Sequence, residues 1–222
     1  MRALTAVLLV IGGLAGAGQG PDDESWLTWT PEQALVVGRT ARVTGRVGGF
    51  WGVRGLHTER AMNYELRVTW LTPEVIRASA RLAQIRDRRT AKDARAWVAD
   101  AEALSDTLAI VELDPREGSG VIPLDWAAYL QPRGAEPGDG RSIQGVPIAK
   151  GRDYPALAGV AKRDYDFDIF WVGFPLRTEA GALLLEGATE AEVVVRVQHS
   201  EGRVRFAIPA SIRRFALPRP GD

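Results

Sequence analysis

The chain has 222 residues, with 28 basic and 28 acidic side chains, a formal net charge of zero and no cysteine. The lack of cysteine excludes disulfides, thiolate nucleophiles, cysteine-ligated zinc and lipid attachment at an exported N-terminus. Nucleic acid is not an expected partner, because its binding depends on a concentrated positive field and the basic residues here are scattered among acidic ones.

The first residues have the order of parts expected of an export signal. Arg2 gives a positive start, residues 4–14 are largely apolar, and residues 15–17 supply small side chains for signal peptidase. A membrane anchor would need about 20 apolar residues, and glycines dilute this shorter run. We therefore expect residues 1–17 to be removed as a signal peptide, which leaves an exported chain, periplasmic or extracellular, without a membrane span. An uncleaved anchor and a buried N-terminal strand are the alternatives.

The pattern that follows predicts an N-terminal segment at residues 18–34, one domain over residues 35–215 and a flexible tail at residues 216–222. Residues 39–47 alternate between apolar and polar side chains, which is typical of a half-buried strand. Residues 64–70 repeat this alternation, so a second strand is expected there.

The next segment changes from strand spacing to helical spacing. Thr72 precedes a proline, which is a typical helix start, and Thr90 begins a capping box. We expect two helices, at residues 73–89 and 91–104, which together form a helical insertion at about 73–104 packed on the sheets. The apolar side chains of the second helix recur at helical spacing: Ala94, Trp97, Val98, Ala101 and Leu104.

Residues 107–113 are apolar on both faces, which predicts a strand in the centre of a sheet. A long irregular segment is expected at about 115–160, because prolines and glycines are frequent there, with a short helical turn at 125–130. Loops of more than about 12–15 residues are uncommon in compact domains and are often functional.

The last predicted strands are residues 165–171 and a hairpin with its turn at residues 199–202. Glu192 falls on the outer face of this hairpin, where we expect it to be exposed. The side chains that face inward alternate along both arms: Val193, Val195, Val197, Val204, Phe206 and Ile208. The predicted fold is mainly β, an antiparallel β-sandwich of immunoglobulin-like general character, with an inserted helical hairpin and a long irregular excursion.

Phe50 and Trp51 are the candidate ligand-binding residues. Glycines flank the pair on both sides, so the backbone can form a tight protruding turn that presents two large aromatic side chains. The alternative is that Trp51 folds back and plugs one end of the sandwich, since large aromatic side chains are highly buried on average.

Asp164, Asp166 and Asp168 form a weak candidate metal site, because they begin like a calcium loop. Ile169 stands where that loop needs glycine, and Pro175 stands where it needs glutamate. The alternative is a charged outer face that discourages pairing between sheet edges. No cofactor is expected, and no residue is nominated as catalytic.

These observations favour an exported, non-catalytic binding or structural module of the bacterial cell envelope or extracellular space that engages a protein partner. A carbohydrate-binding module is the first alternative, with a glycan as partner, because seven tryptophans and the Phe50 and Trp51 pair could stack on sugars. An aspartate-dependent hydrolase is the second alternative, because carboxylates are the abundant acid–base groups of the chain.

Overall fold

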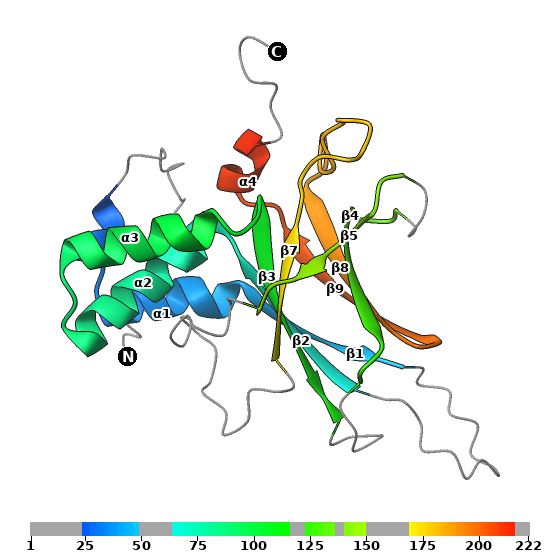
Figure 1. Ribbon diagram of the computed structural model, residues 1–222, viewed down its shortest axis with the longest axis horizontal. Helices are drawn as coiled ribbons and strands as arrows, with labels where there is room; N and C mark the ends of the chain where they lie inside the picture. The colour runs from blue at the N-terminus through cyan, green and yellow to red at the C-terminus, as the bar shows by residue number, and fades with distance from the viewer. Residues whose placement is uncertain (1–23, 49–63, 116–122, 136–139, 150–168, 216–222) are drawn as a thin grey trace, which may run out of the picture.

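The computed structural model describes residues 24–48, 64–115, 123–135, 140–149 and 169–215 (Figure 1). The fold is mainly β, with two antiparallel sheets and a few helices, so the predicted class is confirmed. Sheet A has the order β1 (Arg42–Val47), β2 (Tyr64–Leu71), β3 (Thr107–Asp114), β7 (Ile169–Phe174) and β6 (Val146–Pro147). Sheet B has the order β5 (Ile143–Gln144), β4 (Trp126–Pro132), β8 (Glu190–Val197) and β9 (Ser200–Ala207). The described helices are η1 (Ser25–Thr28), α1 (Pro31–Thr40), α2 (Pro73–Asp87), α3 (Ala91–Glu102) and α4 (Ala210–Phe215).

The main hydrophobic core lies between the two sheets, because alternate side chains of each strand point inward. Trp70 of β2 packs edge-on against Phe206 of β9, with ring centroids 5.6 Å apart. The indole N–H of Trp70 donates a 2.8 Å hydrogen bond to the hydroxyl of Thr107, so its one polar group is satisfied inside the core. All six predicted inward side chains of the hairpin are buried, which confirms the prediction of its two faces.

The two sheets meet along both sides of this core. On one side the chain passes from β5 to β6 through Gly145, whose N–H donates to the carbonyl of Ala128 in sheet B. On the other side β1 and β9 run close together, and a Cβ added at Gly202 would lie 2.5 Å from the carbonyl oxygen of Arg46. We call these two junctions between the sheets the seams. Glycine is needed at both seams because a side chain would collide with the facing strand.

Helices α1, α2 and α3 lie side by side on the outward side of sheet A (Figure 1). A second apolar cluster joins them to the sheet, with members such as Val75 and Val98 from the helices and Ile110 and Trp171 from the strands. This cluster explains why β3 is buried on both faces, as predicted. Among the described helices, none is long and apolar enough to cross a membrane.

The helical insertion is confirmed, with slightly earlier ends than expected. Thr90 and Asp93 form the predicted capping box, in which each side chain accepts a hydrogen bond from the other residue's backbone N–H. Thr72 precedes α2 as predicted, but its side chain makes no cap hydrogen bond. The missing cap is tolerated because tertiary packing, more than capping, stabilises a helix that buries this many side chains.

Helix α1 was not predicted, and it replaces the expected start of the first strand. Thr30 and Gln33 form a capping box ahead of Ala34, and the helix runs through Arg39 before β1 begins at Arg42. The alternation that suggested a strand from residue 39 therefore corresponds to a strand only from Arg42 onward, because helix α1 continues to Thr40.

The prediction of an irregular segment at about 115–160 is wrong in part, because β4, β5 and β6 fall within this range. No helical turn forms at residues 125–130. Ala128 and Leu130 point into the core and pair with Val195 and Val193 of β8. The strand forms because β8 supplies a partner along its whole length, a long-range contact that local propensity does not reveal.

Two further details of the late strands differ from expectation. The hairpin turn consists of Gln198 and His199, because Val197 pairs directly with Ser200, and Gln198 adopts a positive φ of 51°. Strand β7 extends to Phe174, beyond the predicted end at residue 171, while the predicted residues before Ile169 lie outside the described part of the chain. Glu192 is only 2 % exposed, so the prediction that it is solvent-exposed is wrong.

Candidate functional site

The residues nominated from the sequence all lie outside the described ranges. Phe50 and Trp51 fall in the gap before β2, and Asp164, Asp166 and Asp168 fall in the gap before β7. Within the described ranges, no group of three or more histidine, aspartate or glutamate side chains is arranged to hold a metal ion.

Six of the seven tryptophans are described, and they pack into the two cores. Three are buried, and the other three are partly buried and packed against the apolar clusters. These six residues are Trp26, Trp29, Trp70, Trp97, Trp126 and Trp171. The abundance of tryptophan is therefore explained largely by core packing, and sugar stacking by exposed tryptophan rests on Trp51.

The outward face of sheet B carries an ordered polar array that combines exposed and buried members. Because side chains alternate along a strand, the residues between the inward ones point away from the core. Three rows cross β4, β8 and β9 on this face: Gln131, Glu192 and Arg205; Tyr129, Val194 and Arg203; Ala127, Arg196 and Glu201. We call the polar members of these rows the arginine face.

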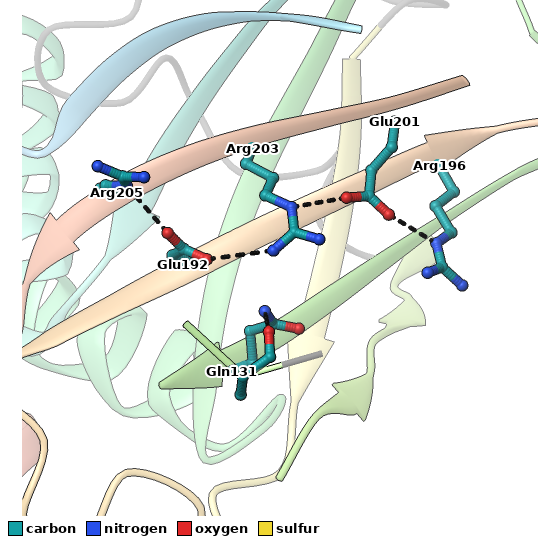
Figure 2. Close-up of polar contacts among 7 residues, drawn as sticks. Gln131, Glu192, Arg196, Glu201, Arg203 and Arg205 are labelled. Carbon is teal, nitrogen blue, oxygen red and sulfur yellow. Dashed lines mark hydrogen bonds and ion pairs between the residues drawn. The ribbon is translucent and has the colours of Figure 1, made fainter. Parts of the chain in front are cut away.

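Arginine and glutamate alternate across this face, so that each carboxylate lies between two guanidinium groups (Figure 2). Nε of Arg205 donates to Glu192 at 2.9 Å, and Arg203 lies 3.7 Å from the other oxygen of that carboxylate. Glu201 in turn accepts hydrogen bonds from Arg203 at 2.6 Å and from Arg196 at 2.9 Å. The five side chains form one continuous chain of charge-assisted contacts.

The chain of ion pairs influences the protonation of Glu201. Partial burial alone would raise the pKa of Glu201, but hydrogen bonds from Arg196 and Arg203, together with their positive charges, lower it overall. Glu201 is therefore ionised at neutral pH and holds both arginines in place. Arg196 also lies 5.3 Å from the ring centroid of Tyr129, a cation–π contact that fixes its position further.

Gln131 belongs to the face, lies at the end of β4 and is completely buried. Its amide N–H donates to the carbonyl of Ala135, which lies in the turn after β4. Its amide oxygen has no hydrogen-bond partner within the described ranges. A buried acceptor without a partner is costly, so this end of the face combines a tightly closed turn with an unsatisfied polar group.

A shallow depression of about 380 Å³ adjoins the same end of sheet B. Arg133, Arg141, Glu186, Thr189 and Glu190 contribute to its lining. Arg133 and Glu190 are already joined at 2.5 Å, so the charges of this pair largely neutralise each other. The depression extends the polar surface of sheet B but adds little net charge to it.

A second ion-pair cluster lies on sheet A, and its members are more enclosed. Arg42 contacts Glu112 at 2.5 Å, and Arg67 contacts Glu65 at 2.6 Å and Asp114 at 3.8 Å. Both arginines are less than one-fifth exposed, whereas the arginines of sheet B are one-third to two-thirds exposed. Sheet B is therefore the better candidate for contact with another molecule.

Comparison with protein-family models, with curated proteins and with solved structures finds no match for this chain. The chemistry of the arginine face must therefore be judged from its own geometry. Its carboxylates are engaged by arginines, which suits them to positioning and not to proton transfer. The guanidinium groups are fixed and partly exposed, which suits them to recognition of anionic or carbonyl groups.

Sequence reasoning missed this face because alternate charged residues on a strand are typical of an ordinary solvated surface. The signal was the pair Arg203 and Arg205, two residues apart on one arm of the hairpin, opposite Glu192 on the other arm. To predict that these three side chains lie together, the exact register of the hairpin would have had to be known.

Proposed function

We propose that this chain is an exported, non-catalytic binding module of the bacterial cell envelope or extracellular space, and that it engages a protein partner through the arginine face. One observation carries this proposal. The helices cover the outward side of sheet A, whereas sheet B presents a pre-arranged polar array on its outward side (Figure 1, Figure 2).

The pre-arrangement of the arginines supports binding over a purely structural role. A free arginine loses about 2 kcal/mol of rotamer entropy when it is immobilised, which opposes binding. Glu192 and Glu201 already hold Arg196, Arg203 and Arg205, so part of this loss has occurred before a partner arrives. Arginine is also among the residues that contribute most energy to protein interfaces.

Export is part of the proposal and rests on the signal-like segment at residues 1–17. An immunoglobulin-like general character of the fold is part of it too, supported by two antiparallel sheets around a shared core. The carbohydrate alternative now rests on Phe50 and Trp51. The hydrolase alternative still rests on the abundance of carboxylates in the sequence.

Affinity capture from an envelope extract tests the proposal. The mature chain serves as bait, beside a double variant of the face, Arg196→Gln with Arg205→Gln, in which Arg203 still pairs with both carboxylates. The matched control is Arg86→Gln with Arg95→Gln, because these arginines are similarly exposed and similarly paired on α2 and α3.

We expect mass spectrometry to identify a protein captured by the wild type and by the control but not by the face variant. Capture by all three baits alike would exclude the arginine face as the binding surface. A glycan array run beside the capture covers the alternative. Binding to a glycan, without capture of any protein, would overturn the proposal of a protein partner.

A further inference from the structure

The exposed layer of the arginine face is cationic, although the face contains both signs of charge. The side chain of Glu192 is 3 % exposed, whereas that of Arg205, its partner, is 61 % exposed. Arg196 shows the same asymmetry with Glu201, at 41 % against 28 %. Each carboxylate is less exposed than the arginines that contact it, and Glu192 is almost fully covered, so an approaching molecule meets more positive than negative charge.

The geometry of the hydrogen bonds leaves the outer ends of two arginines suited to a second contact. A guanidinium has five N–H donors, and the bonds from Arg205 to Glu192 and from Arg196 to Glu201 each use the single donor on Nε. The terminal nitrogens carry the other four, at the tips of side chains that reach solvent. Two parallel N–H groups there match the two oxygens of a carboxylate.

The spacing along β9 adds a further constraint. Arg203 and Arg205 are two residues apart on an extended strand, so their Cα atoms are about 7 Å apart. Alternate side chains of another extended segment have the same spacing. A partner strand with carboxylates at every second position would therefore place one carboxylate opposite Arg205 and the next opposite Arg203, which also contacts Glu192 and Glu201.

We propose that the arginine face binds an acidic, extended segment of a partner protein, with glutamate or aspartate at alternate positions. This inference rests on the proposed function and names the chemistry of the partner. The three arginines outnumber the two carboxylates of the face, and binding of acidic side chains offsets the excess charge. Arg196 contributes from β8, which extends the contact across the hairpin.

The test uses a fluorescent decapeptide that alternates glutamate and threonine, with anisotropy as the measure of binding to the mature chain. A decapeptide that alternates lysine and threonine is the control for charge. A third peptide has the composition of the first but places its glutamates together, which tests the spacing. Thermal melting of each variant shows that it remains folded.

We expect the alternating acidic peptide to bind best and the basic peptide not to bind. The face variant, Arg196→Gln with Arg205→Gln, should weaken binding about tenfold or more, while Arg86→Gln with Arg95→Gln should leave it unchanged. Arg205→Lys should retain only part of the wild-type affinity, because lysine cannot form two parallel hydrogen bonds.

Equal binding of the acidic and basic peptides, or equal binding by the face variant and wild type, would overturn the inference. So would binding of polygalacturonate, a carboxylated polysaccharide, without binding of the acidic peptide. A captured protein that depends on the face but is not displaced by the acidic peptide would overturn this inference alone. Absence of any captured protein would instead count against the proposed function.

Discussion

Glu192 on β8 and Arg205 on β9 face each other across the hairpin, and Nε of Arg205 donates a 2.9 Å hydrogen bond to the buried carboxylate. Burial of a carboxylate is unfavourable unless it is paired and hydrogen-bonded. Arg205 and Arg203 fulfil that condition together, from one strand. The pair therefore contributes to the stability of sheet B as well as to the charge of its surface.

The first prediction concerns this carboxylate. Glu192→Ala leaves Arg203 and Arg205 without their shared acceptor, and we expect it to lower the free energy of unfolding by about 1–3 kcal/mol. Urea denaturation measures the change. Glu190→Ala, on the same strand and face, removes an exposed ion pair with Arg133 and should cost less than about 1 kcal/mol. Equal costs would show that burial of Glu192 has no energetic consequence.

The second prediction concerns the seam between the sheets. Gly202→Ala would place a Cβ 2.5 Å from the carbonyl oxygen of Arg46 and 2.8 Å from Cγ2 of Val47. Since a backbone atom cannot rotate away, β1 and β9 must separate, and we expect a loss of about 1–3 kcal/mol in chemical denaturation. Ser200→Ala, earlier on the same strand, should change stability by less than about 0.5 kcal/mol. A stable Gly202→Ala variant would mean that the seam is not closely packed.

The third prediction concerns the main core. Val195 is fully buried between the sheets, and Val195→Asp would place a charge there without a partner, at a cost comparable to the whole stability of the protein. We expect this variant to be unfolded by circular dichroism and to lack dispersed amide resonances. Val36→Asp, at a position 57 % exposed on α1, should remain folded. Similar behaviour of the two variants would contradict the assignment of inward and outward faces.

The fourth prediction concerns acid stability. The pKa of Glu201 is lowered in the folded protein, because hydrogen bonds and charges of Arg196 and Arg203 together outweigh its burial. Such a carboxyl contributes stability that is fully present above its unfolded pKa, about 4.3, and is lost as the pH falls through the folded pKa.

The stability difference between wild type and Glu201→Gln, measured by denaturation at successive pH values, should therefore be constant near neutrality. It should shrink as the pH falls from about 4.3 through the lower folded pKa, below which both proteins carry an uncharged side chain at this position. Exposed Glu179, before β8, provides the control, and Glu179→Gln should have little effect at any pH. A difference that grows towards low pH would show that the sign of the Glu201 shift is reversed.

The fifth prediction concerns export. Mature protein purified from an exporting host should begin near Gly18, because the small residues before it suit signal peptidase. N-terminal sequencing together with intact mass measures the cleavage point. A chain that retains Met1 and sediments with membranes would contradict removal of the segment.

Several elements could be predicted because their signals are local. The capping box of Thr90 and Asp93 spans three residues, and the hairpin arms alternate without interruption. Strand β3 was recognised as central because apolar side chains occupy both of its faces. In each case a contiguous stretch of sequence contains the physical cause of the structure.

Strand β4 could not be predicted in the same way. Ala127 and Ala128 carry little preference for a strand, and the element is stabilised by pairing with β8, which lies more than fifty residues later. Helix α1 was missed although Thr30 and Gln33 carry a local signal, because the alternation from residue 39 was extended too far towards the N-terminus.

The sequence by itself determined the direction of each hairpin side chain, since a period of two assigns Val193 inward and Glu192 outward whatever surrounds them. Only the tertiary structure decided that Glu192 is buried and that its arginines are exposed. Exposure depends on the length and position of side chains on neighbouring strands, and here Arg203 and Arg205 of β9 reach the carboxylate while Gln131 of β4 pairs beside it. Periodicity reports where a side chain points; the paired strands determine what covers it.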